Sequence, residues 1–146
     1  MKTATILHPT DFSDEANQAE REAVRLARRI DAELLLLHVS VETPLYGEHA
    51  FGMADVKRIY EAQGRWADGH LAARAEALTG EGVPTRWQRR TGVVDELIID
   101  TAREQNADYI VMGTHGRSGI ARLMLGSIAD RVVRTAPCPV LTVRPT

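Results

Sequence analysis

Glycines gather in one segment of the C-terminal third of the chain. Four of the chain's 11 glycines stand close together, namely Gly113, Gly116, Gly119 and Gly126, and Ser127 follows at the predicted start of a helix. Glycine allows a ligand to approach the backbone closely, and the first turn of a helix presents unpaired N–H groups at the positive end of its dipole. This segment is therefore a candidate site for anionic oxygens such as those of a phosphate.

Side chains of the same segment could assist an anion. The Ser127 hydroxyl could donate a hydrogen bond, and Arg117 and Arg122 are the nearest positive charges in the sequence. The alternative interpretation is a flexible turn followed by an ordinary helix cap, because glycine-rich loops also occur without ligands. The spacing of these residues leaves both interpretations open.

An acidic residue follows the first predicted strand. Asp11 lies just beyond the carboxyl end of that strand, where ligands bind in open parallel sheets and where a carboxylate could accept a hydrogen bond from a ribose hydroxyl. The alternative role is an interaction with the first turn of the following helix.

The elements that must position these residues alternate along the chain. Short apolar segments predict strands, and apolar residues three and four positions apart predict helices between them. The predicted strands are Ala4 to His8, Leu34 to Val39, Val83 to Arg89, Tyr109 to Met112 and Val140 to Val143. The helices are expected after Ser13 as N-cap and up to Ile30, within Ala54 to Leu78, from Val94 to before Asn106, and from Ser127 to Pro137. For the last helix, Ser127 and Asp130 have the spacing of a capping box.

This alternation predicts an α/β fold with one doubly wound, five-stranded parallel sheet and helices on both faces. Two strand orders compete, 3-2-1-4-5 and 2-1-3-4-5, and each places the ligand crevice beside the first strand. The segment after the third strand supplies only Gly92, whereas four glycines follow the fourth strand. The sequence therefore predicts the order 3-2-1-4-5. The third strand is polar and has Pro84 near its start, so we expect it at an edge.

Composition excludes several classes of protein. A chain of 146 residues has room for one domain, and a net charge of −2 offers no broad basic surface for nucleic acid. No apolar run is long enough to insert into a membrane, and no secretory leader opens the chain, so a cytoplasmic protein is expected. The five histidines lack metal-ligand spacing, and Cys138 has no second cysteine to pair with. No protein-only metal site is expected.

The arrangement of these segments resembles the universal stress protein family. The resemblance rests on Gly113-x2-Gly116-x9-Gly126-Ser127, on the strand Ala107 to Met112 before it, on Ala136 to Val143 after it, and on the opening Ile6 to Ser13. It covers essentially the whole chain. It implies one domain over residues 1–146 that binds an adenine nucleotide and that usually forms a dimer. We expect ATP as the nucleotide, with Mg²⁺ as an optional companion held by few or no protein ligands.

The resemblance also implies roles for individual residues. Asp11 would serve the ribose, the main chain of Val39 the adenine edge, and Pro9, Thr10 and Met112 the pocket walls. The phosphate path would be lined by Gly113, Gly116, Gly126, Ser127 and Ile128. His115 and Arg117 fall inside the motif as further candidate binding residues whose individual roles the motif does not define.

Three functions remain open on the sequence alone. The first is a homodimeric sensor or adaptor that binds ATP and acts on a regulatory protein partner, with Val140 to Val143 as the pairing strand. The second is a slow ATPase or nucleotidyl-transfer enzyme that uses the same pocket. The third is a nucleotide-free dimeric interaction module. The sequence lacks the phosphate-binding lysine motif of fast nucleotide hydrolases, so we favour the first.

Overall fold

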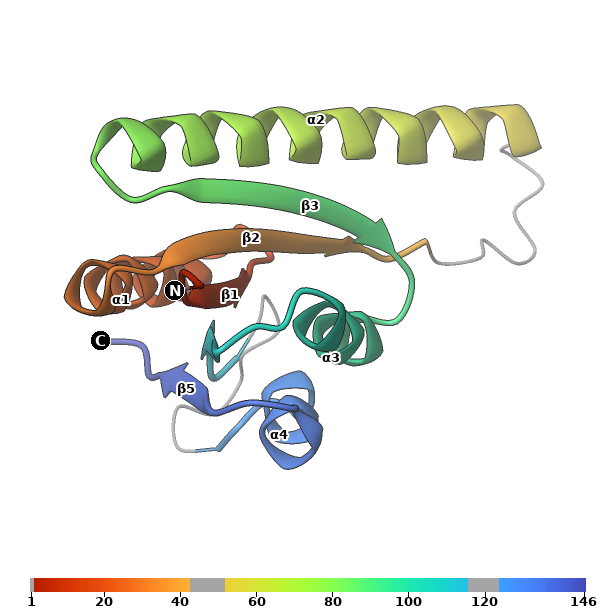
Figure 1. The fold of residues 1–146 in the computed structure, drawn as a ribbon. Coiled ribbons are helices and arrows are strands. Elements are labelled where there is room, and N and C mark those ends of the chain that lie inside the picture. The colour runs from red at the N-terminus through yellow and green to blue at the C-terminus, as the bar shows by residue number, and fades with distance from the viewer. Residues whose placement is uncertain (1, 43–51, 116–123) are drawn as a thin grey trace.

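A parallel sheet forms the centre of the molecule. The structure is a computed structural model and describes residues 2–42, 52–115 and 124–146. Within these ranges the strands are β1 (Thr5–Pro9), β2 (Glu33–Ser40), β3 (Thr85–Thr91), β4 (Tyr109–Gly113) and β5 (Val140–Val143). All neighbouring strands pair in parallel, in the order β3-β2-β1-β4-β5 (Figure 1). The predicted fold class and strand order are confirmed.

Helices cover both faces of this sheet. They are α1 (Asp14–Ile30), α2 (Met53–Gly80), α3 (Val94–Glu104) and α4 (Ser127–Thr135). One buried cluster joins the sheet to α1 and α2, for example Ile6 and Leu34 with Ala23 and Leu78. The other cluster joins the opposite face to α3 and α4. The sheet is therefore enclosed on both sides, as parallel sheets require.

The apolar strands explain why the centre is so deeply buried. Each of Leu34, Leu35, Leu36 and Leu37 in β2 is at most 1% exposed. A strand that is covered on both faces has no solvent side, so a continuous apolar run replaces the alternation of a half-buried strand. The third strand differs, since β3 lies at the sheet edge and most of its residues are exposed or half-buried. Its predicted edge position is confirmed.

Both α1 and α4 start where the sequence predicts, but only the N-cap of α1 agrees with the prediction. The Ser13 hydroxyl accepts a hydrogen bond from Ala16 N at 3.2 Å, as expected of an N-cap. The predicted capping box at Ser127 is wrong, because Ser127 is already helical and Gly126 is the N-cap, with no side-chain hydrogen bond to the helix. The Asp130 carboxylate accepts from Arg134 in the following turn.

Element bounds shift by one or two residues. The largest shift is in β3, which starts at Thr85 rather than at Val83. Val83 belongs to the preceding turn, where its N–H donates to Leu78 O at 3.0 Å. Its side chain is 2% exposed, so the apolar signal at this position reports burial rather than strand pairing.

No helix in the described ranges is long and apolar enough to cross a membrane.

Candidate functional site

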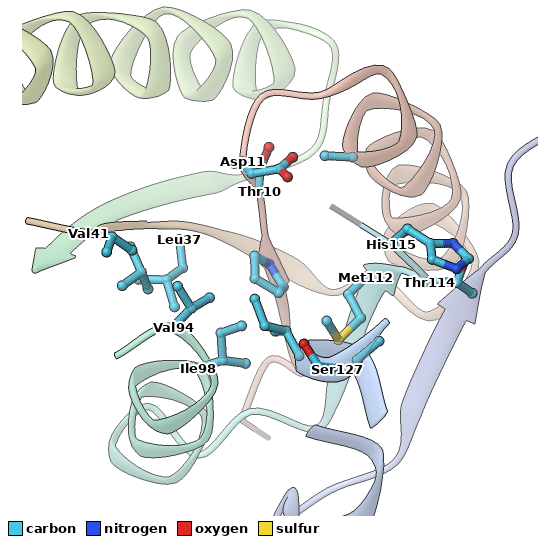
Figure 2. A pocket seen from close by; sticks show the side chains of 16 residues that line it. Thr10, Asp11, Leu37, Val41, Val94, Ile98, Met112, Thr114, His115 and Ser127 are labelled. Carbon is cyan, nitrogen blue, oxygen red and sulfur yellow. The ribbon is translucent and has the colours of Figure 1, made fainter. Parts of the chain in front are cut away.

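A cavity opens at the carboxyl ends of the central strands. It has a volume of about 330 Å³ and lies where the chain reverses direction between β1 and β4, the position at which open α/β sheets bind ligands. In Figure 2, Asp11 and Ser127 lie at opposite ends of this pocket. Its lining residues are Pro9, Thr10, Asp11, Ala16, Leu37, Val39, Val41, Val94, Ile98, Met112, Gly113, Thr114, His115, Ser127, Ile128 and Ala129.

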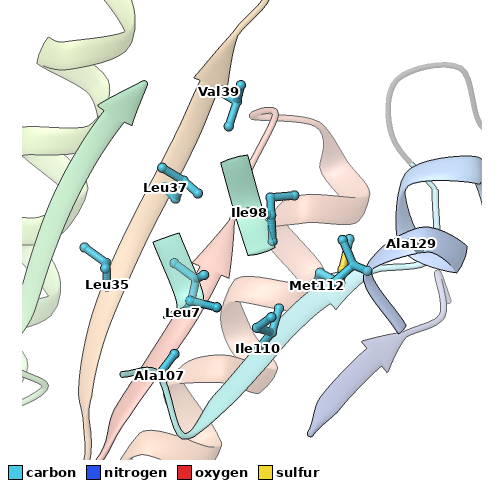
Figure 3. Close-up of a cluster of buried hydrophobic side chains, with 11 residues drawn as sticks. Leu7, Leu35, Leu37, Val39, Ile98, Ala107, Ile110, Met112 and Ala129 are labelled. Atoms are coloured by element: carbon cyan, nitrogen blue, oxygen red, sulfur yellow. The ribbon is translucent and has the colours of Figure 1, made fainter. Parts of the chain in front are cut away.

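The apolar walls of the pocket are an extension of the core. Leu37, Val39, Ile98, Met112 and Ala129 belong both to the lining and to the buried cluster beneath α3 and α4 (Figure 3). Because this cluster is packed from β1, β2, α3, β4 and α4, the walls are held in place without a ligand. Such a slot suits a flat apolar group with polar edges.

The main chain of Val39 faces the side of the pocket. In β2 the even-numbered residues bond to β3, since Leu34 N donates to Pro84 O and Gly92 N donates to Ser40 O. The odd-numbered residues therefore point to β1, and Leu37 O accepts from Thr10 N at 2.8 Å. Strand β1 ends at Pro9, opposite Leu37. The N–H and C=O of Val39 consequently face the space beyond the end of β1, where a ligand edge could take the place of a strand.

Asp11 is held by the turn between β1 and α1. Its Oδ1 accepts from Ser13 N at 3.0 Å, and Thr10 Oγ1 accepts from Phe12 N at 3.0 Å. Phe12 has a φ of 65°, a left-handed conformation that is uncommon for a residue other than glycine. The two roles weighed for Asp11 are thus compatible in space, because its carboxylate bonds the backbone before α1 and also lines the pocket.

The first turn of α4 closes the opposite end of the pocket. Ser127, Ile128 and Ala129 are its first three residues, and all three line the cavity. The N-cap Gly126 has no side chain to cap these N–H groups, so within the described part of the chain the positive end of the helix dipole is available to a ligand. This arrangement can stabilise a phosphate without lysine or arginine.

Gly126 does not line the cavity but packs closely against the backbone of Thr114. A Cβ at this position would lie 2.9 Å from Thr114 O. Gly126 N donates to the same oxygen at 2.7 Å. The absence of a side chain therefore lets the start of α4 lie directly against the end of β4.

His115 lies beside this junction. Its side chain is 7% exposed, and its Nδ1 is 3.0 Å from Thr114 Oγ1 and 3.7 Å from Glu15 Oε2 of α1. Within the described residues, His115 Nε2 and Glu15 Oε2 are buried without a hydrogen-bond partner. An acid and a base thus meet between α1 and the start of α4.

Another buried histidine precedes the pocket. His8 of β1 is 0% exposed, and its Nδ1 lies 2.8 Å from Val111 O of β4. Burial lowers the pKa of His8 below its ordinary value of 6.5, against the opposing effects of the Val111 hydrogen bond and of the Glu20 and Asp11 charges. The neutral imidazole is therefore the form that the fold stabilises.

Most of the candidate residues named from the sequence line this one cavity. They are Pro9, Thr10, Asp11, Val39, Met112, Gly113, His115, Ser127 and Ile128. Gly126 lies next to the cavity, and Gly116 and Arg117 lie outside the described residues. Whether any of them binds a ligand stays a prediction.

The sequence reasoning missed other lining residues. Leu37 and Val41 could have been found, because residues two positions from Val39 share its face of the strand. Val94 and Ile98 were placed only on an apolar stripe of a helix. Nothing in their spacing indicates that the start of α3 reaches the crevice.

Comparison with known proteins agrees with this geometry. Residues 2–144 match the model of the Universal stress protein family. The chain belongs to this family. The match includes β1, the turn with Asp11, and the first turn of α4, so both ends of the pocket fall within the universal stress protein region.

Similar universal stress proteins occur in bacteria and archaea. One from Thermus aquaticus is 39% identical over 142 residues, which cover 96% of this chain and 98% of the relative. Another from Methanocaldococcus jannaschii is 35% identical over 140 residues, covering 95% of this chain and 81% of the relative.

Solved universal stress proteins share the fold. The structure of UspA from Lactobacillus plantarum superposes with a TM-score of 0.84 at 27% identity and covers 99% of both chains. A universal stress protein in complex with cAMP has a TM-score of 0.71 at 24% identity, with 98% of each chain covered. One from Archaeoglobus fulgidus in complex with dAMP has a TM-score of 0.64 at 22% identity, with 98% of each chain covered.

Proposed function

We propose that this universal stress protein binds ATP in the cavity between β1 and β4. The observation that carries the proposal is the presence of three complementary features in one cavity. These are an apolar slot beside the main chain of Val39, the carboxylate of Asp11, and the uncapped first turn of α4. They match the base, the ribose and the phosphates of one molecule.

The base would occupy the slot formed by β2, α3 and β4. Leu37, Ile98 and Met112 offer apolar surface for the faces of a purine, and the N–H and C=O of Val39 offer one donor and one acceptor for its edge. The carboxylate of Asp11 can only accept hydrogen bonds when ionised, which suits a ribose hydroxyl.

The phosphates would lie against the first turn of α4. There the N–H groups of Ser127, Ile128 and Ala129 carry the positive end of the helix dipole. The phosphate chain of ATP can place anionic oxygens against these N–H groups. Universal stress proteins in complex with cAMP and dAMP show that this fold accepts adenine nucleotides elsewhere in the family.

Magnesium would arrive with the nucleotide. Among the described lining residues, Asp11 supplies the one carboxylate, a ligand type that Mg²⁺ prefers. Mg²⁺ commonly keeps several waters and takes its remaining ligands from phosphate oxygens. The residues therefore fit an ion held mainly by the bound nucleotide.

We further propose that the protein acts in the cytoplasm as a homodimeric sensor whose state is read by a regulatory protein. The edge position of β5 supports this proposal. Strand β5 ends the sheet, and its Leu141 side chain is 44% exposed. An apolar edge strand favours pairing with another chain, and a twofold contact with a second copy is the simplest solution.

Titration calorimetry of Asp11→Asn tests the binding site. The amide oxygen can still accept from Ser13 N, but the ionised acceptor for the ribose is lost. We expect ATP affinity to fall about tenfold, the effect of losing roughly 1.4 kcal/mol of a charge-assisted hydrogen bond. Asp14→Asn is the matched control, because Asp14 is a nearby exposed carboxylate of α1 outside the lining. Equal affinity in both variants would place the nucleotide elsewhere.

A further inference from the structure

Glu15 and His115 form a buried acid–base pair beside the proposed phosphate position. Their closest atoms, Glu15 Oε2 and His115 Nδ1, are 3.7 Å apart, and their side chains are 24% and 7% exposed. Each also has a buried atom without a hydrogen-bond partner among the described residues, Glu15 Oε2 and His115 Nε2. Buried polar atoms in native structures are nearly always paired, so these two atoms indicate that a further group belongs at this junction.

The pair touches the element that would hold the phosphates. A Cβ on Gly126, the N-cap of α4, would lie 3.5 Å from His115 Cα and 3.8 Å from His115 Cδ2. The imidazole therefore packs against the positive end of the α4 dipole. His115 is also one of the residues that line the cavity.

Charges around His115 act in opposite directions. Glu15 of α1 presents a carboxylate 3.7 Å from His115 Nδ1, whereas α4 presents the positive end of its dipole. The charged side chains of α4 are engaged elsewhere: Asp130 pairs with Arg134, and Arg131 lies 3.4 Å from Asp95 of α3. A phosphate at the first turn of α4 would offset the dipole and add negative charge next to the ring.

We propose that His115 takes up a proton when a nucleotide phosphate binds at the start of α4, so that nucleotide binding is coupled to pH. This inference rests on the proposed ATP site and adds its regulation. The proton comes from solvent and binds Nε2, the imidazole nitrogen that has no hydrogen-bond partner among the described residues, and the resulting imidazolium faces the Glu15 carboxylate. His115 is a positioning residue in this scheme, because its charge stabilises the phosphate through the packed junction. A universal stress protein built in this way would bind ATP more tightly as pH falls.

Calorimetry in buffers of different ionisation enthalpy measures the coupling directly. The slope of the observed heat against buffer enthalpy gives the number of protons taken up per ATP bound. The terminal phosphate of ATP titrates in the same pH range, so the informative quantity is the difference between wild type and His115→Gln. We expect wild type to take up more protons, and its ATP affinity to fall about tenfold more than that of the variant between pH 6 and pH 8.

Two further variants test whether the proton uptake depends on Glu15 and His115 rather than on any histidine of the protein. Glu15→Gln removes the carboxylate that favours the imidazolium, and we expect it to move the maximum of proton uptake to lower pH. His70→Gln changes an exposed histidine of α2 outside the lining and should leave proton uptake as in wild type. Equal proton uptake in wild type and His115→Gln, with ATP bound by both, would overturn the coupling and leave the binding site standing.

A second measurement uses only the wild-type protein, so its result does not depend on whether a variant folds. Long-range ¹H–¹⁵N spectra of the wild-type protein follow the protonation of each histidine with and without ATP. We expect one buried histidine to titrate at higher pH when ATP is bound. No change at any histidine under saturating ATP would overturn the proposal. Absence of any ATP binding would overturn the proposed function together with it.

Discussion

Asp11 and Phe12 show how two adjacent residues at the end of one strand can have different surroundings. Asp11 lines the pocket, whereas the ring of Phe12 lies 4.5 Å from that of His38 and 5.0 Å from that of Trp66 in α2. The left-handed backbone at Phe12 makes this division possible. The sequence predicted the place of Asp11 from the end of the strand. It could not predict the conformation of Phe12, because no glycine or asparagine marks the position.

At the same scale, His8 should make the stability of the fold depend on pH. Burial lowers its pKa below the ordinary value of 6.5, so below that pH the unfolded chain binds a proton that the folded chain does not. The contribution of His8 to the free energy of unfolding is fully present above about pH 6.5. It is lost as the pH falls toward the lower pKa of His8 in the folded chain, with a slope of at most about 1.4 kcal/mol per pH unit. Urea unfolding between pH 7.5 and 5.5 measures it.

Two variants identify the histidine responsible for this slope. His8→Asn can still donate to Val111 O but cannot bind a proton in this range. This variant should be less stable than wild type at pH 7.5. Its stability should also fall much less than that of wild type as the pH decreases. His70→Gln changes an exposed residue of α2 and should keep the wild-type slope. If His8→Asn declines as steeply as wild type, the loss of stability comes from another group.

At the scale of elements, the start of α4 depends on a close approach between backbones. Gly126→Ala would place a Cβ 2.9 Å from Thr114 O, so the end of β4 or the start of α4 must move. Overpacking of this kind costs about 1–3 kcal/mol. We expect a lower melting temperature in scanning calorimetry for this variant.

The matched control is Gly80→Ala at the end of α2. A Cβ there would meet no atom within 4 Å. Alanine also favours helix over glycine by roughly 1 kcal/mol, so this variant should melt at or above the wild-type temperature. Gly126→Ala melting no lower than Gly80→Ala would show that the glycine is not required by packing.

The same element shows what spacing can and cannot predict. The glycine-rich segment correctly indicated a ligand-sized crevice after β4, because glycine marks positions where the backbone is approached closely. It did not indicate that Gly126 is approached by Thr114 rather than from within the pocket. The capping box failed for a similar reason, since the pattern of Ser127 and Asp130 gives the start of the helix but does not reveal that Gly126 is its N-cap.

At the scale of the whole molecule, the topology was largely predictable. Alternating strands and helices with right-handed connections left two strand orders, and the glycines after β4 selected the observed one. The pocket walls could not be predicted, because the contact of Val94 and Ile98 with the crevice depends on how α3 packs across the sheet. Long-range packing of this kind leaves no periodic signal in one chain.

The free edge of this sheet predicts assembly. Light scattering should give the mass of two chains for wild type, and Leu141→Arg in β5 should shift it to the mass of one chain, because a buried unpaired charge opposes the contact. Val133→Arg is the control, since Val133 of α4 is 45% exposed and lies off the sheet edge. Wild type with the mass of one chain at micromolar concentration, or equal effects of both variants, would contradict pairing through β5.

The central claim is that one cavity of this universal stress protein holds the base, ribose and phosphates of ATP. A crystal structure of the protein grown with saturating ATP and Mg²⁺ tests it most directly. We expect electron density with adenine beside the main chain of Val39, ribose at Asp11 and phosphates at the first turn of α4. Density for ATP at another place, or an empty cavity at saturating ATP with Asp11 and Ser127 positioned as described, would contradict it.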